Sequence, residues 1–235
     1  FTITAADLDN GSSDNCGIVT STMAFDSAGT NTLDVGFMAN NAAAGNMFDI
    51  MALNAITVNS FDISPNVQPG EVHDYAVYFK VGSWIGSETT PGDWTLLASP
   101  TGIVTVESNA PTALDLSLGI DVAAGELVAF YITSTDGSTL GYTGATGTTG
   151  VGNLWASDDN IEFYEGAGKA YPFGSTYAPR VWNGQIQYDS FTTPFSGTFD
   201  CSNVGTNNLI VTHTDAAGNS TSCTSTVTVS DVTAP

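Results

Sequence analysis

The chain has 235 residues, and 42% of them are hydrophobic, which is enough for a packed core and argues against wholesale disorder. It carries 24 acidic residues but only three cations, so its formal net charge is -21 at pH 7. Three cations cannot form a basic patch, which argues against binding to a nucleic-acid backbone or to anionic lipid. Most carboxylates must therefore repel one another, lie in water or bind metal cations.

The predicted elements are almost all strands. One short Ala-rich stretch, residues 40–47, is compatible with a helix, although Gly45 interrupts it. Elsewhere apolar and polar residues alternate in short segments separated by turn pairs such as Pro69-Gly70. The segments predicted as strands are residues 55–63, 74–80, 94–98, 103–107, 113–120, 126–133, 184–188, 207–213 and 221–229. Many short strands at close spacing predict an all-β chain of the β-sandwich type.

The two ends of the chain differ from its middle in composition. All four tryptophans and all eight tyrosines fall between residues 75 and 188, whereas the three cysteines lie in flanks rich in Thr and Ser. This shift predicts two units, a central domain of residues 29–192 inserted into a smaller domain made of residues 1–28 and 193–235. No apolar run approaches the roughly 20 residues that span a bilayer, so no direct membrane insertion is expected.

The flanks carry motifs in a recognisable order. One half is residues 7–18 (DLDNGSSDNCGI), and the other is residues 199–207 (FDCSNVGTN), 211–223 (VTHTDAAGNSTSC) and 227–229 (VTV). Joined, they resemble one HYR-type immunoglobulin-like repeat, a family found in tandem in large surface adhesins and secreted proteins of Bacteroidota. The resemblance implies an immunoglobulin-like β-sandwich, here without its opening strand, an extracellular or cell-surface location, and neighbouring repeats of the same polypeptide or filament as partners.

The resemblance also implies a pairing of the cysteines. With the central domain left out, Cys16 and Cys201 become neighbours in one small domain, and we expect a disulfide between them that clamps the two ends of the insert together. In the family pattern the partner of Cys223 is a cysteine of the absent opening strand. Cys223 is therefore expected to be free or bonded outside the chain.

The central domain resembles a β-sandwich module of secreted bacterial multidomain proteins. The resemblance is carried by residues 45–50 (GNMFDI), 168–174 (GKAYPFG) and 179–184 (PRVWNG). It implies a larger, jelly-roll-like β-sandwich as the inserted domain, and it implies nothing about a ligand.

Aromatic side chains make glycan binding by the insert a hypothesis, because exposed Trp and Tyr rings can stack on sugar rings. Trp84, Trp155 and Tyr164 lie in Gly/Ser/Asp-rich neighbourhoods typical of loops and are the candidate glycan contacts. The alternative is that the aromatic residues fill the core, as expected for Trp94 and Trp182.

Calcium is the one cofactor that the acidic residues suggest. Asp7, Asp9 and Asp14 space carboxylates around a turn, as calcium-binding loops do, although the spacing is not that of an EF-hand. Asp215 in a predicted hairpin turn and Asp231 beside a predicted linker are further candidate ligands. The same residue types are also plain turn formers, and this alternative stays open.

Catalysis has little support in the sequence. No Ser, Cys or metal motif accompanies His73 or His213, the only histidines, and a glycosidase pair chosen from 24 acids carries no information. The chain is therefore not expected to be an enzyme. Residues 26–28 (DSA) resemble the O-glycosylation sequon of Bacteroidota, which makes Ser27 a candidate modification site.

We expect a structural and adhesive repeat segment of a large extracellular bacterial surface protein or filament. It would present the inserted domain for recognition, with glycans or cell surfaces as targets. The alternative is a carbohydrate-binding module attached to a secreted enzyme. Exposed aromatic rings on one face of the insert would separate binding from a pure spacer role.

Overall fold

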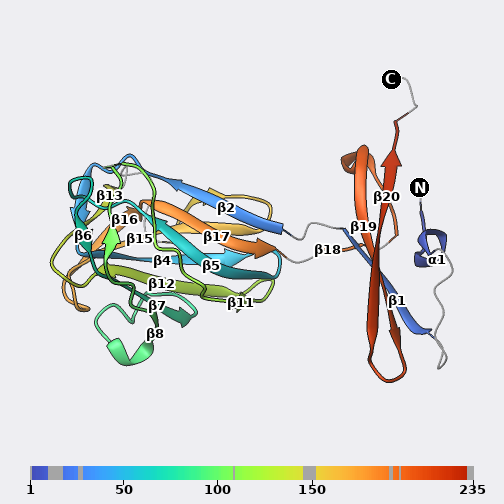
Figure 1. Cartoon of the computed structure of the whole chain (residues 1–235), viewed down its shortest axis with the longest axis horizontal. Helices are drawn as coiled ribbons and strands as arrows, with labels where there is room; N and C mark the ends of the chain where they lie inside the picture. Colours follow the sequence, from blue (N-terminus) through green and yellow to red (C-terminus); the bar gives the residue numbers. More distant parts are fainter. Residues whose placement is uncertain are drawn as a thin grey trace. The chain divides into compact units, whose positions relative to one another are not determined.

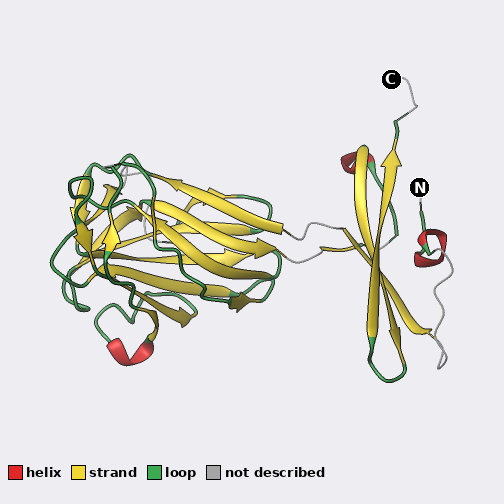
Figure 2. Ribbon diagram, in the orientation of Figure 1, coloured by secondary structure: helices red, strands yellow, loops and turns green. Residues whose placement is uncertain are grey.

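The computed structural model describes residues 2–9, 18–25, 29–107, 109–144, 152–190, 193–195 and 197–231. This described part is nearly all antiparallel β-structure, which confirms the predicted all-β class (Figures 1 and 2). Its helical elements are single turns: α1 (Ala5–Leu8), η1 (Pro91–Asp93) and η2 (Cys201–Asn203). No helix among the described residues is long and apolar enough to cross a membrane.

The chain divides into two compact units. One unit consists of Phe1–Gly29 together with Phe191–Pro235, and the other is Thr30–Ser190. The first unit is therefore built from two segments that lie far apart in the sequence.

A four-stranded antiparallel sheet forms the first unit. Its strands are β1 (Ile18–Phe25), β18 (Thr193–Pro194), β19 (Gly205–Asp215) and β20 (Ser220–Val229), in the order β18-β1-β19-β20. Ile3, Phe195, Phe199 and Leu209 are buried together and form its small core. The sheet thus joins β1 from the first segment to three strands from the second.

The cysteines of this unit are free where the structure describes them. Cys201 and Cys223 are both exposed and unbonded. Cys16 and Ser27 lie outside the described residues. The disulfide between Cys16 and Cys201 and the modification of Ser27 therefore stay predictions.

The unit Thr30–Ser190 contains two large sheets (Figure 1). The five-stranded sheet has the order β10-β5-β17-β2, with β11 also paired to β5; its strands are β2 (Gly29–Gly36), β5 (Ile56–Ile63), β10 (Thr112–Ala113), β11 (Ile120–Val122) and β17 (Gly184–Ser190).

The second large sheet has nine strands in the order β3-β13-β16-β15-β4-β12-β7-β8, with β14 also paired to β15. These strands are β3 (Asn41–Ala43), β4 (Gly45–Ala52), β7 (Tyr75–Val81), β8 (Thr95–Ala98), β12 (Leu127–Ser134), β13 (Leu140–Gly144), β14 (Leu154–Ser157), β15 (Ile161–Lys169) and β16 (Thr176–Trp182). A separate ribbon pairs β6 (Val72–His73) with β9 (Ile103–Val104).

Aromatic rings from both large sheets meet in one core. Phe48 on β4 stacks on Trp182 of β16 with 4.7 Å between ring centroids, and it meets Phe61 of β5 edge-on at 6.3 Å. Phe130 and Phe163 complete this fully buried group. Side chains of the two sheets therefore pack face to face, as in a β-sandwich, and Trp182 is a core residue as expected.

The stretch compatible with a helix is extended, and one predicted strand is wrong. Within residues 40–47, Asn41–Ala43 form β3 and β4 begins at Gly45, which lies so close to β12 that a Cβ there would be 2.4 Å from the Ile132 carbonyl oxygen. Residues 113–120 are not one strand, because Asp115 and Gly119 have positive φ angles of 49° and 61°. The strand β10 ends at Ala113 for this reason, and β11 begins only at Ile120.

Gly166 tests the strand contacts of the nine-stranded sheet. A Cβ at this position would lie 1.9 Å from the Met47 carbonyl oxygen, whereas one at Gly92 would meet nothing within 4 Å. We predict that Gly166→Ala lowers the free energy of unfolding by about 2–3 kcal/mol or more, since β4 and β15 must separate, while Gly92→Ala changes it by less than about 0.5 kcal/mol. Urea denaturation of both variants measures this, and equal stabilities would contradict the close approach of the two strands.

Candidate functional site

A second cluster of aromatic residues lies apart from the sandwich core and includes Trp84 and Trp94, which are 2% and 8% exposed. Asp49 fixes the loop that carries Trp84, because its carboxylate accepts hydrogen bonds from Ser83 Oγ at 2.6 Å and from Trp84 N at 2.9 Å. Burial raises the pKa of Asp49, and these two bonds oppose that rise. The prediction of Trp84 as a glycan contact is wrong, since its indole is covered by protein.

The clearest candidate binding site is a pocket of about 590 Å³ beside β3, β13 and the loop between β15 and β16. Tyr142, Tyr171 and Tyr177 contribute to its lining. Tyr171 is 42% exposed and Tyr177 is 50% exposed, whereas Tyr142 is buried. Lys169 is the one charged residue in the lining formed by the described residues. The pocket thus offers exposed aromatic rings and no carboxylate.

The loop that carries Tyr171 is held by bonds at its base. Lys169 Nζ donates to the Gly174 carbonyl oxygen at 2.6 Å and to Thr176 Oγ1 at 2.7 Å. Phe173 is 7% exposed and packs edge-on against Tyr131, with 5.0 Å between ring centroids. The loop is therefore anchored at two points, and this fixes the wall of the pocket that Tyr171 forms.

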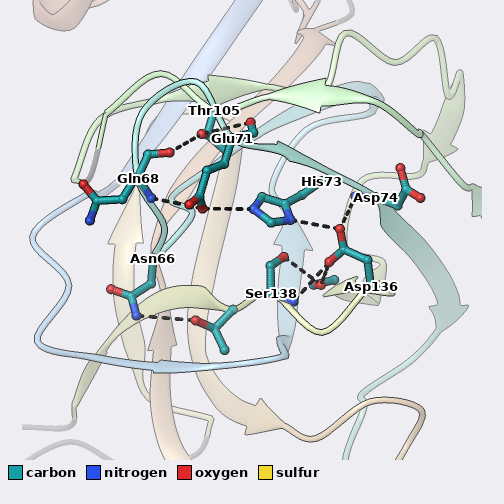
Figure 3. A network of polar contacts seen from close by, with 10 residues as sticks. Asn66, Gln68, Glu71, His73, Asp74, Thr105, Asp136 and Ser138 are labelled. Atoms are coloured by element: carbon teal, nitrogen blue, oxygen red, sulfur yellow. Dashed lines mark hydrogen bonds and ion pairs between the residues drawn. The ribbon is translucent and has the colours of Figure 1, made fainter.

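Another wall is the turn between β12 and β13, which Asp136 organises (Figure 3). Asp136 Oδ1 accepts hydrogen bonds from Ser134 Oγ at 2.9 Å and Ser138 N at 3.0 Å. Its Oδ2 lies 2.9 Å from His73 Nδ1 and accepts a further bond from Asp74 N at 3.1 Å. Ser134 and Ser138 both line the pocket, so Asp136 sets the shape of this wall.

His73 lies between two carboxylates, with Nδ1 on Asp136 and Nε2 at 3.3 Å from Glu71 Oε2 (Figure 3). Burial favours the neutral ring, but the bonds to Asp136 and Glu71 outweigh it and raise the pKa of His73. Burial likewise opposes ionisation of Asp136, yet its hydrogen bonds lower the pKa of this carboxyl. Because Asp136 separates His73 from the two serines, the imidazole does not contact a serine nucleophile as it does in a catalytic triad.

A second, polar pocket of about 360 Å³ adjoins the first. Both pockets share Ala42 in their linings, and Asn66 Nδ2 donates to Thr139 Oγ1, a residue of the first pocket, at 3.4 Å. Four amide side chains line the second pocket: Asn40, Asn41, Asn66 and Asn109. The combined surface therefore sets amide donors and acceptors next to tyrosine rings.

The other two predicted glycan contacts do not line either pocket. Trp155 is half-buried against the sandwich core, and its Nε1 donates to the Val35 carbonyl oxygen at 3.2 Å. Tyr164 is half-buried on β15, and its hydroxyl donates to Glu162 Oε2 at 2.5 Å; this bond, with burial, raises the pKa of Tyr164 to about 12. Sequence reasoning missed Tyr171 and Tyr177, although Tyr171 belongs to one of the quoted motifs.

Two of the predicted calcium ligands already accept local hydrogen bonds. Asp7 Oδ2 accepts bonds from both N and Oγ1 of Thr4 at 2.7 Å, and these bonds lower the pKa of Asp7. Asp215 in the β19–β20 turn accepts bonds from Asn219 Nδ2 at 2.8 Å and from the amides of Asn219 and Ala217 at 2.9 and 2.8 Å; these bonds lower its pKa. Both carboxylates therefore serve as turn-forming groups.

The remaining calcium candidates do not form a cluster where the structure describes them. Asp9 Oδ1 lies 3.6 Å from His213 Nε2, Asp231 is exposed, and Asp14 lies outside the described residues. No group of three His, Cys, Asp or Glu side chains among the described residues could hold a metal ion. Because Asp14 and its neighbours lie outside the described residues, calcium binding stays a prediction.

The charged network at His73 predicts a pH-dependent contribution to stability. A raised His73 pKa in the folded state gives stabilisation that is present below the unfolded pKa of about 6.5 and is lost as pH rises through the folded pKa. Because the pKa of Asp136 is lowered, its carboxylate, which pairs with His73, stays charged down to below about pH 4. Wild type should therefore exceed His73→Gln in melting temperature by about 1–3 °C at pH 5.5, and by less at pH 9. A gap that is the same at both pH values would show that His73 acts through packing alone.

The predicted calcium site has a direct thermal test. Calcium that binds only the folded chain stabilises it by mass action, so calcium should raise the melting temperature and chelator should lower it. Asp14→Asn should reduce the calcium effect, with Asp93→Asn, in the other unit, as the control for lost charge. Identical melting curves with calcium and with chelator at matched ionic strength would dismiss the site.

Comparisons with known proteins show no family for this chain. No family model matches the chain, and no curated protein matches it. A solved structure described as the crystal structure of infectious bursal disease virus VP2 subviral particle is similar at 8% sequence identity with a TM-score of 0.25. The match covers 75% of this chain and 47% of that chain, so this chain spans about half the length of the structure it matches.

Proposed function

We propose that the chain is a recognition segment of a large extracellular bacterial surface protein or filament, and that its unit Thr30–Ser190 binds a saccharide. The observation that carries the proposal is that two exposed tyrosine rings, Tyr171 and Tyr177, line one pocket. Ligand pockets are lined mainly by apolar and aromatic side chains with a few polar groups, and the lining of this pocket has that character.

The chemistry of the two adjoining pockets suits a sugar. A sugar ring has apolar C–H faces that pack on tyrosine rings, and hydroxyl groups that need donors and acceptors at its edge. Tyr171 and Tyr177 supply the rings, and the asparagines of the second pocket, including Asn66 and Asn109, supply paired donors and acceptors.

The walls of the pocket are held before any ligand arrives. Asp136 fixes one wall through hydrogen bonds, and Lys169 and Phe173 fix the other. A site whose groups are already ordered loses less conformational entropy on binding. This favours binding of a saccharide to a preformed surface over chemistry that needs a closing lid.

The unit formed by the two chain ends would serve as the structural part of the segment. Its two segments carry the motifs that resemble an HYR-type repeat, and neighbouring repeats of the same polypeptide are its proposed partners. The same pocket would also suit a carbohydrate-binding module attached to a secreted enzyme. The other domains of the parent protein would distinguish a surface protein from such an enzyme. In both, the role proposed for this chain is binding and not catalysis.

Binding to a panel of immobilised oligosaccharides tests the proposal. We predict that Tyr171→Ala and Tyr177→Ala each weaken binding about ten-fold or more, since each removes one ring face, and that Tyr177→Phe largely keeps it. Tyr164→Ala is the matched control, because Tyr164 lies outside the pocket and should leave affinity within about two-fold. If no saccharide binds, or if Tyr164→Ala alone abolishes binding, the pocket is not the site.

A further inference from the structure

Two of the three cations of this chain lie at the tyrosine-lined pocket. Lys169 is part of the lining. The guanidinium carbon of Arg180 lies 5.4 Å from the centre of the Tyr142 ring, which is also in the lining. A Cβ at Gly168 would meet Ala43, Tyr142 and Arg180 at 3.4, 3.4 and 3.7 Å, so these three side chains converge on one spot. Arg180 is not in the lining itself, but it lies against Tyr142, which is.

Neither cation has a carboxylate partner among the described residues. Every ion pair found there involves a histidine. Lys169 is fully buried, and the two oxygens that its Nζ contacts, on Gly174 and Thr176, are neutral. Glu88 acts on Lys169 only from beyond ion-pair distance. Burial lowers the pKa of Lys169, and its ammonium group has no carboxylate within ion-pair distance among the described residues.

Arg180 is half-buried, and not all of its N–H groups have a hydrogen-bond partner. Its Nη1 donates to the Pro179 carbonyl oxygen at 2.7 Å, and its buried Nε has no hydrogen-bond partner. An uncompensated charge at a partly buried site is costly unless something pairs with it. The chain has 24 acidic residues that could supply such a partner, yet the described pocket lining contains none. The positive charge is therefore left for a group from outside the chain.

We infer that the pocket takes an acidic saccharide, whose anionic group binds Arg180 while its sugar ring packs on Tyr171 and Tyr177. This inference rests on the proposed saccharide-binding function and narrows it. The planar guanidinium of Arg180 matches the geometry of a carboxylate or sulfate oxygen pair. Lys169 is too buried for contact and contributes through its field, which is weakly screened in the protein interior.

The charge of the whole chain makes this inference easy to test. At a net charge of -21 the protein repels polyanions in general, so adventitious binding of an acidic saccharide to its surface is disfavoured. Affinity for such a ligand must come from a local positive site. The three cations offer a matched pair of variants, because Lys80 lies on β7, on the far side of β15, β4 and β12 in the sheet order from Arg180 on β16.

The experiment compares neutral oligosaccharides with uronate-bearing, sialate-bearing and sulfated ones, using the whole chain. We expect the acidic members to bind at least ten-fold more tightly than their carboxyl-reduced or desulfated counterparts. Arg180→Gln should remove this preference, Arg180→Lys should restore part of it, and Lys80→Gln should change affinity by less than two-fold. The uronate and sulfate arms show which anionic group is taken.

The possible outcomes separate this inference from the proposed function. Tyr171-dependent binding of neutral sugars with no preference for acidic ones overturns the inference and leaves the proposed function standing. A preference for acidic sugars that Arg180→Gln does not change also overturns it. Failure of every saccharide to bind at millimolar concentration removes both. Melting curves of Arg180→Gln and Arg180→Lys that match wild type establish that the variants are folded.

Discussion

The central constraint in the larger unit is that β4, β12 and β15 are buried almost along their whole length. On β4, Phe48 packs in the sandwich core, while its neighbour Met47 packs in the second cluster with Trp84 and Trp94. Alternating side chains of a strand point to opposite faces, so both faces of the sheet must be covered. One face is covered by the five-stranded sheet. The other face is covered by loops that carry large apolar side chains, among them the loop with Trp84 and the loop with Phe173.

The chain has only three Lys and Arg residues, and several of its carboxylates are paired with hydrogen-bond donors of other kinds. Asp49, Asp136 and Asp158 accept hydrogen bonds from backbone amides and hydroxyls close by instead of from Lys or Arg. Such bonds fix turns and stabilise the ionised carboxylate in the same step. These three aspartates therefore hold local structure without an ion pair to Lys or Arg. As a result, Lys169 and Arg180 are not needed as partners for these carboxylates.

The sequence predicted the elements whose pattern is locally complete. Residues 126–133 form a nearly continuous apolar run and match β12 to within one residue at each end, and residues 207–213 alternate and lie within β19. The site was predicted less well, because the burial of a tryptophan in a loop depends on a partner far away in sequence: Trp84 is held by Asp49, 35 positions earlier. Tyr171 and Tyr177 carry no local signal of exposure. Two residues apart on one loop, Phe173 is buried in the aromatic cluster while Tyr171 is exposed, and this difference appears only in the folded chain.

The two walls of the pocket are held by different chemistry, which has a consequence for binding. Phe173 packs in an apolar cluster and Lys169 bonds to neutral oxygens, so the Tyr171 wall is insensitive to pH in the range where His73 titrates. The Asp136 wall instead depends on a histidine whose pKa is raised by its bonds to Asp136 and Glu71 and whose ring loses its charge as pH rises through that pKa. Alkaline pH would therefore loosen the serine side of the pocket and leave the tyrosine side in place. A ligand held chiefly by ring stacking would tolerate this change, whereas one that also bonds to Ser134 or Ser138 would not.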